Sequence, residues 1–164
     1  ASLKMLLSVP ITTILDPACG SAQLERMLPK GKYKLILSDL SKIMIQKVKE
    51  WLPEAEVLIE DLGAIISRTS AVDCIVLTET LEHLEDPSKI LQLCRGRTTY
   101  LLVSSPIWHG LEIDPEEGHV WAWDIQGYLE LLKKNLWVPL FTTHVLFFGH
   151  GYDWQIYLCK ELKP

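Results

Sequence analysis

Short apolar runs alternate with helical patterns along most of this 164-residue chain. The runs, "CIVLT" and "YLLVS" among them, have the near-continuous hydrophobicity of strands covered on both faces. The five expected strands are Thr12–Asp16, Lys34–Ser38, Ala55–Glu60, Asp73–Thr78 and Thr99–Ser104. Because strand–helix–strand connections are right-handed, the alternation predicts an α/β fold with a doubly wound, mostly parallel sheet.

Helix start signals stand between these strands. The residues expected to cap helices are Ser21, Ser41, Asp86 and Asp124. Ser21 would begin a helix over Ala22–Leu28, and the helix after Asp124 would run through Leu132. In the helix after Ser41, the apolar residues at helical spacing are Met44, Val48, Trp51 and Leu52.

The alternation ends before residue 140. Two consecutive strand-like runs, "LFTTHVLFFG" and "DWQIYLCKEL", are joined by "HGY", which predicts a C-terminal antiparallel hairpin and seven strands in all. The length predicts one domain over residues 1–164, without a separate substrate-cap domain. A hydrophobic content of 48% and a charged content of 23% are those of a globular protein.

The loop after the first strand, "DPACGSA", is the leading candidate for a ligand site. In open α/β sheets the ligand lies past the carboxyl ends of the strands, and Ala18, Gly20 and Ala22 let it approach the backbone. A tight turn that merely needs small residues is the alternative. Asp39 ends the next strand, 23 residues after Asp16, where nucleoside-binding folds place an acid for the ribose hydroxyls.

The single glycine of this loop cannot match the G-x-G-x-x-G fingerprint of dinucleotide-binding folds. The chain instead resembles class I S-adenosylmethionine-dependent methyltransferases. Their acid-x-Gly-x-Gly-x-Gly motif is matched as Asp16, Ala18, Gly20 and Ala22, with alanine in place of two glycines. The resemblance continues through "EDLG", "LTETLEHLEDP", "LLVSSP" and the terminal hairpin.

The resemblance implies a site for the methyl donor S-adenosylmethionine. Asp39 would hold the ribose, Leu40 would pack on the adenine, and Asp61 would lie near the adenine amino group. The backbone around Thr78 and Glu79 would meet the methionine portion. The full set of implied donor-binding residues is Asp16, Ala18, Cys19, Gly20, Asp39, Leu40, Asp61, Leu62 and Thr78.

"ETLEH" places Glu79, Glu82 and His83 on one face if the segment is helical, and "EGHVWAWD" supplies His119. Two carboxylates and two imidazoles suit Mn, Fe, Co or Zn better than Mg. The E-x-x-E-H element is similar to that of 3′-terminal small-RNA 2′-O-methyltransferases and quinone-pathway O-methyltransferases, which implies four metal ligands. Without a metal, His83 would be a general base, and His83 and Glu79 are the candidate catalytic residues.

These patterns predict methyl transfer to an oxygen of a small molecule or of an RNA hydroxyl. The alternatives are a catalytically silent donor-binding subunit that activates a partner, and a nicotinamide oxidoreductase, which the missing glycines disfavour. The short segment before the first strand predicts an open cleft, covered by a second copy or a partner subunit if at all.

Composition bears on the partners and the compartment. A net charge of −5 argues against a protein coated with nucleic acid, and no apolar run reaches the ~20 residues of a membrane span. Four scattered cysteines without a C-x-x-C pair argue against a zinc cluster or disulfides and predict a cytoplasmic location.

Overall fold

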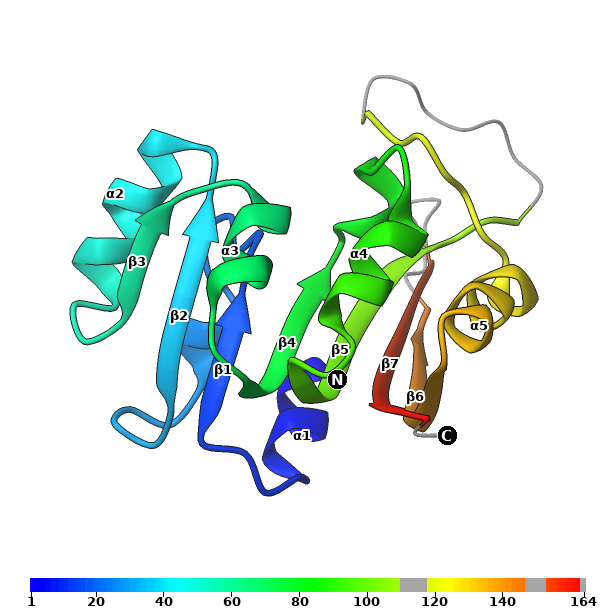
Figure 1. The fold of residues 1–164 in the computed structure, drawn as a ribbon, viewed down its shortest axis with the longest axis horizontal. Helices are drawn as coiled ribbons and strands as arrows, with labels where there is room; N and C mark the ends of the chain where they lie inside the picture. The colour runs from blue at the N-terminus through cyan, green and yellow to red at the C-terminus, as the bar shows by residue number, and fades with distance from the viewer. Residues whose placement is uncertain (110–117, 147–152, 163–164) are drawn as a thin grey trace.

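A computed structural model of the protein describes residues 1–109, 118–146 and 153–162. Its centre is a seven-stranded sheet in the order β3-β2-β1-β4-β5-β7-β6 (Figure 1). The strands are β1 (Thr13–Asp16), β2 (Lys34–Asp39), β3 (Glu56–Ile59), β4 (Val72–Thr78), β5 (Thr98–Ile107), β6 (Trp137–Val145) and β7 (Asp153–Glu161). The first five strands are parallel, and β7 is antiparallel to both of its neighbours. The predicted fold class is confirmed.

Helices cover both faces of the sheet and give three layers. They are α1 (Ser2–Leu7), α2 (Lys42–Trp51), α3 (Leu62–Arg68), α4 (Pro87–Cys94) and α5 (Ile125–Lys134), with short 3₁₀ helices η1 (Glu25–Met27) and η2 (Leu81–His83). One apolar cluster joins α1 and α2 to the sheet, and a second joins α3, α4 and α5 to its other face. Along β2, Leu35 and Leu37 belong to the first cluster and Ile36 to the second, as alternation along a strand requires.

Three of the expected helix caps are confirmed. Ser41, Asp86 and Asp124 each accept a hydrogen bond from a backbone N–H in the first turn of the helix that follows. Each cap pairs one of the N–H groups that a helix start leaves without an intrahelical partner.

Replacing Asp86 with alanine should lower the free energy of unfolding by about 1 kcal/mol. The Lys89 N–H, 3.1 Å from Asp86 Oδ1, would lose its acceptor. Denaturant unfolding measures the change, and Glu85→Ala at the neighbouring exposed acid is the control, with an expected change within about 0.5 kcal/mol. Equal losses in the two variants would show that the cap itself contributes nothing.

The predicted helix over Ala22–Leu28 is wrong. Only Glu25–Met27 is helical, as the 3₁₀ helix η1, and the Ser21 side chain caps nothing there. The backbone is left-handed at Gly20 (φ 50°) and at Ala22 (φ 51°), so an α-helix cannot begin at this point.

Two further expectations need correction. Trp51 is not a core residue of α2, because it is 39% exposed. The Arg26 guanidinium lies over its ring, 4.1 Å from the ring centroid. Ile45 is the residue of α2 that is buried instead. The sixth strand starts earlier than predicted, at Trp137, whose buried indole N–H donates to the Leu91 carbonyl. The predicted "HGY" turn lies outside the described residues.

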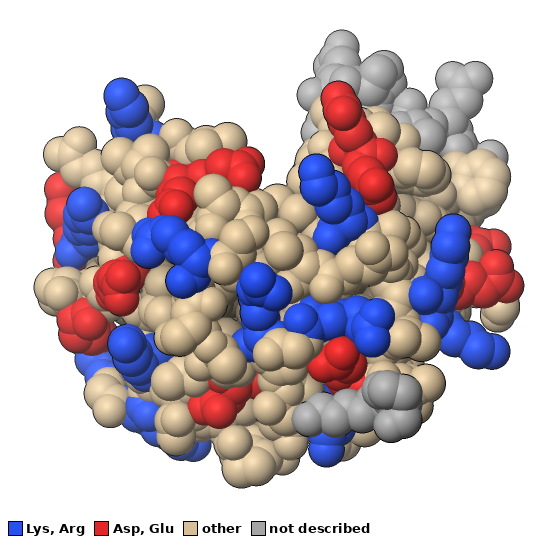
Figure 2. Space-filling view, viewed as in Figure 1, with Lys and Arg blue, Asp and Glu red and all other residues tan. Residues whose placement is uncertain are grey.

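The carboxyl ends of the five parallel strands all lie on the same side of the sheet. The strand order reverses between β1 and β4. Figure 2 shows a notch in the molecular outline at this edge, with acidic side chains on both of its rims. Ligands of open α/β sheets bind at such a reversal point. None of the helices that the structure describes is long and apolar enough to cross a membrane.

Candidate active site

Two adjoining cavities lie at the reversal point, a larger one of about 640 Å³ and a smaller one of about 330 Å³. They share Ala18 and Glu79. Every residue that the sequence assigned to donor binding lines one of them. Asp16, Cys19, Gly20 and Thr78 line the larger cavity, Asp39, Leu40, Asp61 and Leu62 line the smaller one, and Ala18 lines both.

The loop after β1 is held open by backbone geometry and by one carboxylate. Apart from its chain neighbours, no atom of the described residues lies within 4 Å of the position that a Cβ on Gly20 would occupy, but the positive φ there disfavours any side chain. The Gly20 N–H donates to Asp39 Oδ2 over 2.9 Å, and the Ser41 N–H donates to Oδ1 over 2.8 Å. Asp39 therefore ties the loop to the end of β2.

A buried pair of acids lies below this loop, and sequence reasoning found only one of them. Asp16 is 4% exposed and Glu25 is 2% exposed, and each carboxyl group affects the pKa of the other. Burial raises the pKa of Asp16 well above its usual value, and the charge of Glu25 raises it further. Glu25 was missed because it was expected on an ordinary helix.

Cys19 also lies in the loop, and its thiol is a poor nucleophile. Burial raises the pKa of this thiol, and the charges of Asp16 and Asp39 raise it further. The thiol therefore stays protonated at neutral pH. Cys19 stabilises the loop through its backbone N–H, which donates a hydrogen bond to the Ser38 carbonyl over 2.9 Å.

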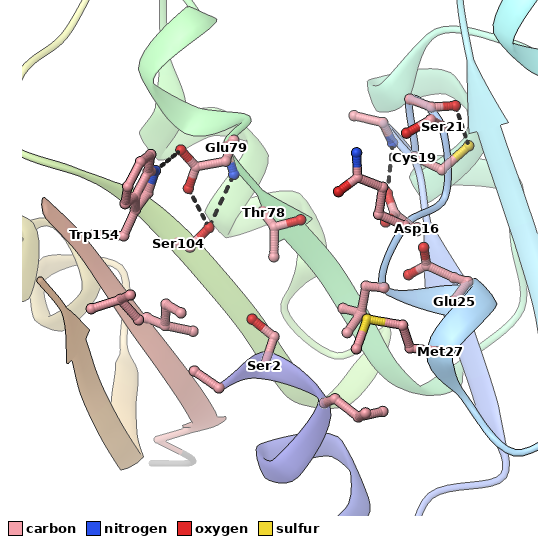
Figure 3. Close-up of a pocket in the computed structure, with 18 residues that line it drawn as sticks. Ser2, Asp16, Cys19, Ser21, Glu25, Met27, Thr78, Glu79, Ser104 and Trp154 are labelled. Carbon is pink, nitrogen blue, oxygen red and sulfur yellow. Dashed lines mark hydrogen bonds between the residues drawn. The ribbon is translucent and has the colours of Figure 1, made fainter. Parts of the chain in front are cut away.

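Glu79 follows β4 with a left-handed backbone (φ 51°), which turns its side chain toward β5 and β7. Its carboxylate accepts hydrogen bonds from Ser104 Oγ and from Trp154 Nε1, the latter over 2.7 Å (Figure 3). Burial raises the pKa of Glu79, and these two hydrogen bonds lower it in part. Its place in both cavities puts this carboxylate at their junction.

Glu82, His83 and His119 form a second polar group beside the smaller cavity. One candidate ligand atom from each lies within 4.8 Å of the others. The Glu82 side chain is almost fully buried, and neither carboxylate oxygen has a hydrogen-bond partner of good geometry among the described residues. Burial, and secondarily the charge of Glu79, raise the pKa of Glu82 to about 8. The backbone N–H groups of Glu82 and Thr80 lower the pKa of this carboxyl in part. An orphaned buried carboxylate beside two imidazoles fits a divalent metal ion.

Backbone hydrogen bonds bring His119 to His83 across the sequence. The N–H groups of Val120 and Trp121 both donate to the Glu82 carbonyl, and the Trp121 indole N–H donates to the Leu84 carbonyl over 2.9 Å. His83 Nδ1 lies 3.1 Å from the Gly118 carbonyl oxygen. Because a carbonyl only accepts, Nδ1 carries the hydrogen, and Nε2 of the neutral ring keeps its lone pair.

The expected set of four ligands is thus only partly brought together. The segment after β4 forms one short 3₁₀ helix, so Glu79 does not share a helical face with Glu82 and His83. The Glu79 carboxylate lies with Ser104 and Trp154 and is absent from the described group of three. Burial and hydrogen bonding therefore separate Glu79 from its expected partners.

Comparison with known proteins places the chain in a family. A family model described as a methyltransferase domain matches residues 15–98, about half of the chain. A search of curated protein sequences found no match.

Solved structures of several enzymes share the fold. A Leishmania major S-adenosylmethionine-dependent methyltransferase has a TM-score of 0.82 at 17% identity, over 97% of this chain and 70% of its own. The Burkholderia thailandensis 1,6-didemethyltoxoflavin-N1-methyltransferase, solved with S-adenosylhomocysteine, has a TM-score of 0.78 at 13% identity, over 98% and 75%. The small RNA methyltransferase HEN1 has a TM-score of 0.75 at 18% identity, over 99% of this chain but 24% of its own. The chain therefore belongs to the methyltransferase domain family and is a class I S-adenosylmethionine-dependent methyltransferase, as its resemblance predicted.

Proposed function

We propose that this methyltransferase transfers the donor's methyl group to a hydroxyl oxygen of its acceptor, with a divalent metal ion held by Glu82, His83 and His119. The observation that carries the proposal is the Glu82 carboxylate, which is buried beside two imidazoles and has no hydrogen-bond partner of good geometry in the part of the chain that the structure describes. Burying a carboxylate without a hydrogen-bond partner costs several kcal/mol of stability. The presence of such a group beside two imidazoles therefore points to a bound ligand.

The two cavities support a donor that bridges them. In the smaller cavity, Asp39 suits the ribose and Leu40 suits the adenine. Leu40 is 69% exposed, so an adenine ring could pack on it. The open backbone at Gly20 in the larger cavity suits the amino-acid end. The sulfonium and its methyl group then lie where the cavities join, near Ala18 and Glu79.

The residues beside this junction would act on the acceptor and not on the donor. A divalent ion bound there would lower the pKa of an acceptor hydroxyl and help to hold its oxygen in line with the methyl group. His83 lines the smaller cavity directly, and the Gly118 carbonyl fixes its tautomer. Ordering of a ligand imidazole by a second hydrogen bond is typical of metal sites.

A metal-free reaction is the second candidate, and the same His83 geometry favours it. A neutral imidazole with Nδ1–H fixed on a carbonyl presents Nε2 as a base for the acceptor hydroxyl. The two candidates differ in one measurement, methyl transfer from labelled donor to acceptors in cell extracts after exhaustive chelation. Loss of transfer, restored by Mn²⁺, Co²⁺, Zn²⁺ or Mg²⁺, supports the metal site, and unchanged transfer supports the base.

Asp39→Ala should weaken binding of S-adenosylmethionine by about 10- to 100-fold, because a charged hydrogen-bond acceptor for the ribose is lost. Calorimetry on the wild type and the variant measures this, with NAD as the ligand expected not to bind. The matched control is Asp73→Ala. The Asp73 carboxylate likewise accepts hydrogen bonds from backbone N–H groups, those of Thr12 and Thr13. It does so at the other ends of the parallel strands, away from the donor site. Unchanged donor affinity in Asp39→Ala would refute the assignment.

A further inference from the structure

The larger cavity is acidic and apolar. Among the described residues that line it, Asp16, Glu25 and Glu79 carry carboxyl groups, and none is a lysine, arginine or histidine. Asp39, Glu60 and Asp61 extend the acidic lining into the smaller cavity.

Glu79 is the acid that an acceptor would meet. It follows β4, and its carboxylate faces Ser104 of β5 and Trp154 of β7, on the far side of Thr78 from the loop with Asp16 and Glu25 (Figure 3). Both of its partners are neutral donors, one on each oxygen. A carboxylate oxygen has a second lone pair, so Glu79 has further acceptor capacity toward the cavity.

The rest of the cavity lining is mixed. Its apolar part includes Leu3, Met27, Val145 and Ile156 with the Trp154 ring, and its polar part consists of uncharged side chains such as Ser2, Ser21 and Gln23. An anionic acceptor in this space would lose its hydration, face a carboxylate, and meet no lysine, arginine or histidine side chain among the described residues of the wall. A cationic acceptor would instead form a charge-assisted hydrogen bond with Glu79 and bury its carbon skeleton on the wall.

The same charges bear on an RNA acceptor. The 3′-terminal hydroxyl of an RNA stands one sugar away from a phosphate, and phosphates are bound by arginine, lysine or backbone N–H groups. The larger cavity offers the Glu79 carboxylate in their place. An RNA terminus would therefore bring its negative charge against Glu79.

We propose that the acceptor is a small cationic molecule, such as an amine with a hydroxyl group, and that Glu79 selects it by receiving a hydrogen bond from its positively charged group. Anionic acceptors, RNA included, are excluded by the same carboxylate. This inference rests on the proposed function only for the position of the donor. It does not use the metal ion, because the Glu79 carboxylate hydrogen-bonds to Ser104 and Trp154 and is not part of the group formed by Glu82, His83 and His119.

The test uses phenols of one shape and three charges. Tyramine is cationic, 4-ethylphenol is neutral, and 4-hydroxyphenylacetate is anionic. Calorimetry would measure the affinity of each for the purified protein saturated with S-adenosylhomocysteine, alongside a short single-stranded RNA with a free 3′ end. Wild type should bind tyramine at least tenfold more tightly than 4-hydroxyphenylacetate and should not bind the RNA. Glu79→Gln should reduce that ratio to near unity.

Two further variants separate charge from fold. Glu79→Asp keeps the carboxylate and should keep the order of affinities, while Glu50→Gln removes an exposed acid on α2 and should change nothing. Equal affinity for tyramine and 4-hydroxyphenylacetate in the wild type, tight RNA binding, or an unchanged ratio in Glu79→Gln would overturn the inference. Failure of S-adenosylhomocysteine to bind would refute the donor position on which both proposals rest, whereas a lost charge preference with this product bound refutes only this one.

Discussion

Glu82→Gln is expected to reduce methyl transfer by roughly 10³-fold or more while leaving donor affinity unchanged. The substitution keeps the size of the side chain but removes the charged oxygen ligand beside His83 and His119. Glu82 does not line either cavity, so the donor contacts are not altered directly. Single-turnover transfer from labelled donor, together with calorimetry of donor binding, measures the two effects separately.

The controls for this prediction use the metal content and a neighbouring acid. Elemental analysis should find a divalent metal in the wild type and much less in Glu82→Gln. Glu85→Gln, at an exposed acid three positions further along, should retain both metal and activity. Full activity of a wild-type protein shown to be metal-free would reject the metal site. His83→Ala would then be the slow variant, as expected for a lone base.

Most of the fold could be predicted because it depends on periodicity. The near-continuous apolar runs identified the five parallel strands, with ends within a few residues of the observed ones. The hairpin of β6 and β7 followed from two consecutive strand patterns without a helix between them. Caps were predictable for the same local reason, since Ser41, Asp86 and Asp124 each accept a hydrogen bond from an N–H group only three residues away.

The donor site could be predicted for a related reason. Its residues follow directly after strands, and the carboxyl ends of parallel strands meet at one edge of the sheet. Asp16, Asp39 and Thr78 each end their strand, and all three line the cavities.

The details of the second polar group could not be predicted from spacing. Helical spacing placed Glu79 with Glu82 and His83, but a left-handed turn at Glu79 breaks the periodicity. Its actual partners, Ser104 and Trp154, are remote in sequence. Glu25 shows the same limit, because its burial depends on how the loop after β1 folds over the sheet and not on any local pattern.

The burial of Glu82 lowers the stability of the metal-free protein as the pH rises, although the same carboxylate is proposed to support activity as a metal ligand. In the metal-free protein the pKa of its carboxyl is raised to about 8, chiefly by burial, whereas the unfolded chain has the usual value near 4.5. Between these two pH values the native state binds one more proton than the unfolded state. Stability contributed by this group is therefore fully present below about pH 4.5 and is lost as the pH rises toward 8.

Glu82→Gln should accordingly stabilise the metal-free protein at pH 8.5, by a few kcal/mol less the cost of burying an amide. The difference in unfolding free energy from the wild type should shrink as the pH falls and nearly vanish by pH 5. Urea unfolding of both proteins in chelator across this range measures it, and comparing the pair cancels the opposite trend of acids such as Asp73, whose pKa is lowered. Adding Mn²⁺ at pH 8.5 should then stabilise the wild type but not the variant, because only the wild type keeps the carboxylate ligand. A difference between the two proteins that does not change with pH would show that the Glu82 carboxyl is hydrated in solution. Glu82 would then not be the buried carboxylate on which the metal site depends.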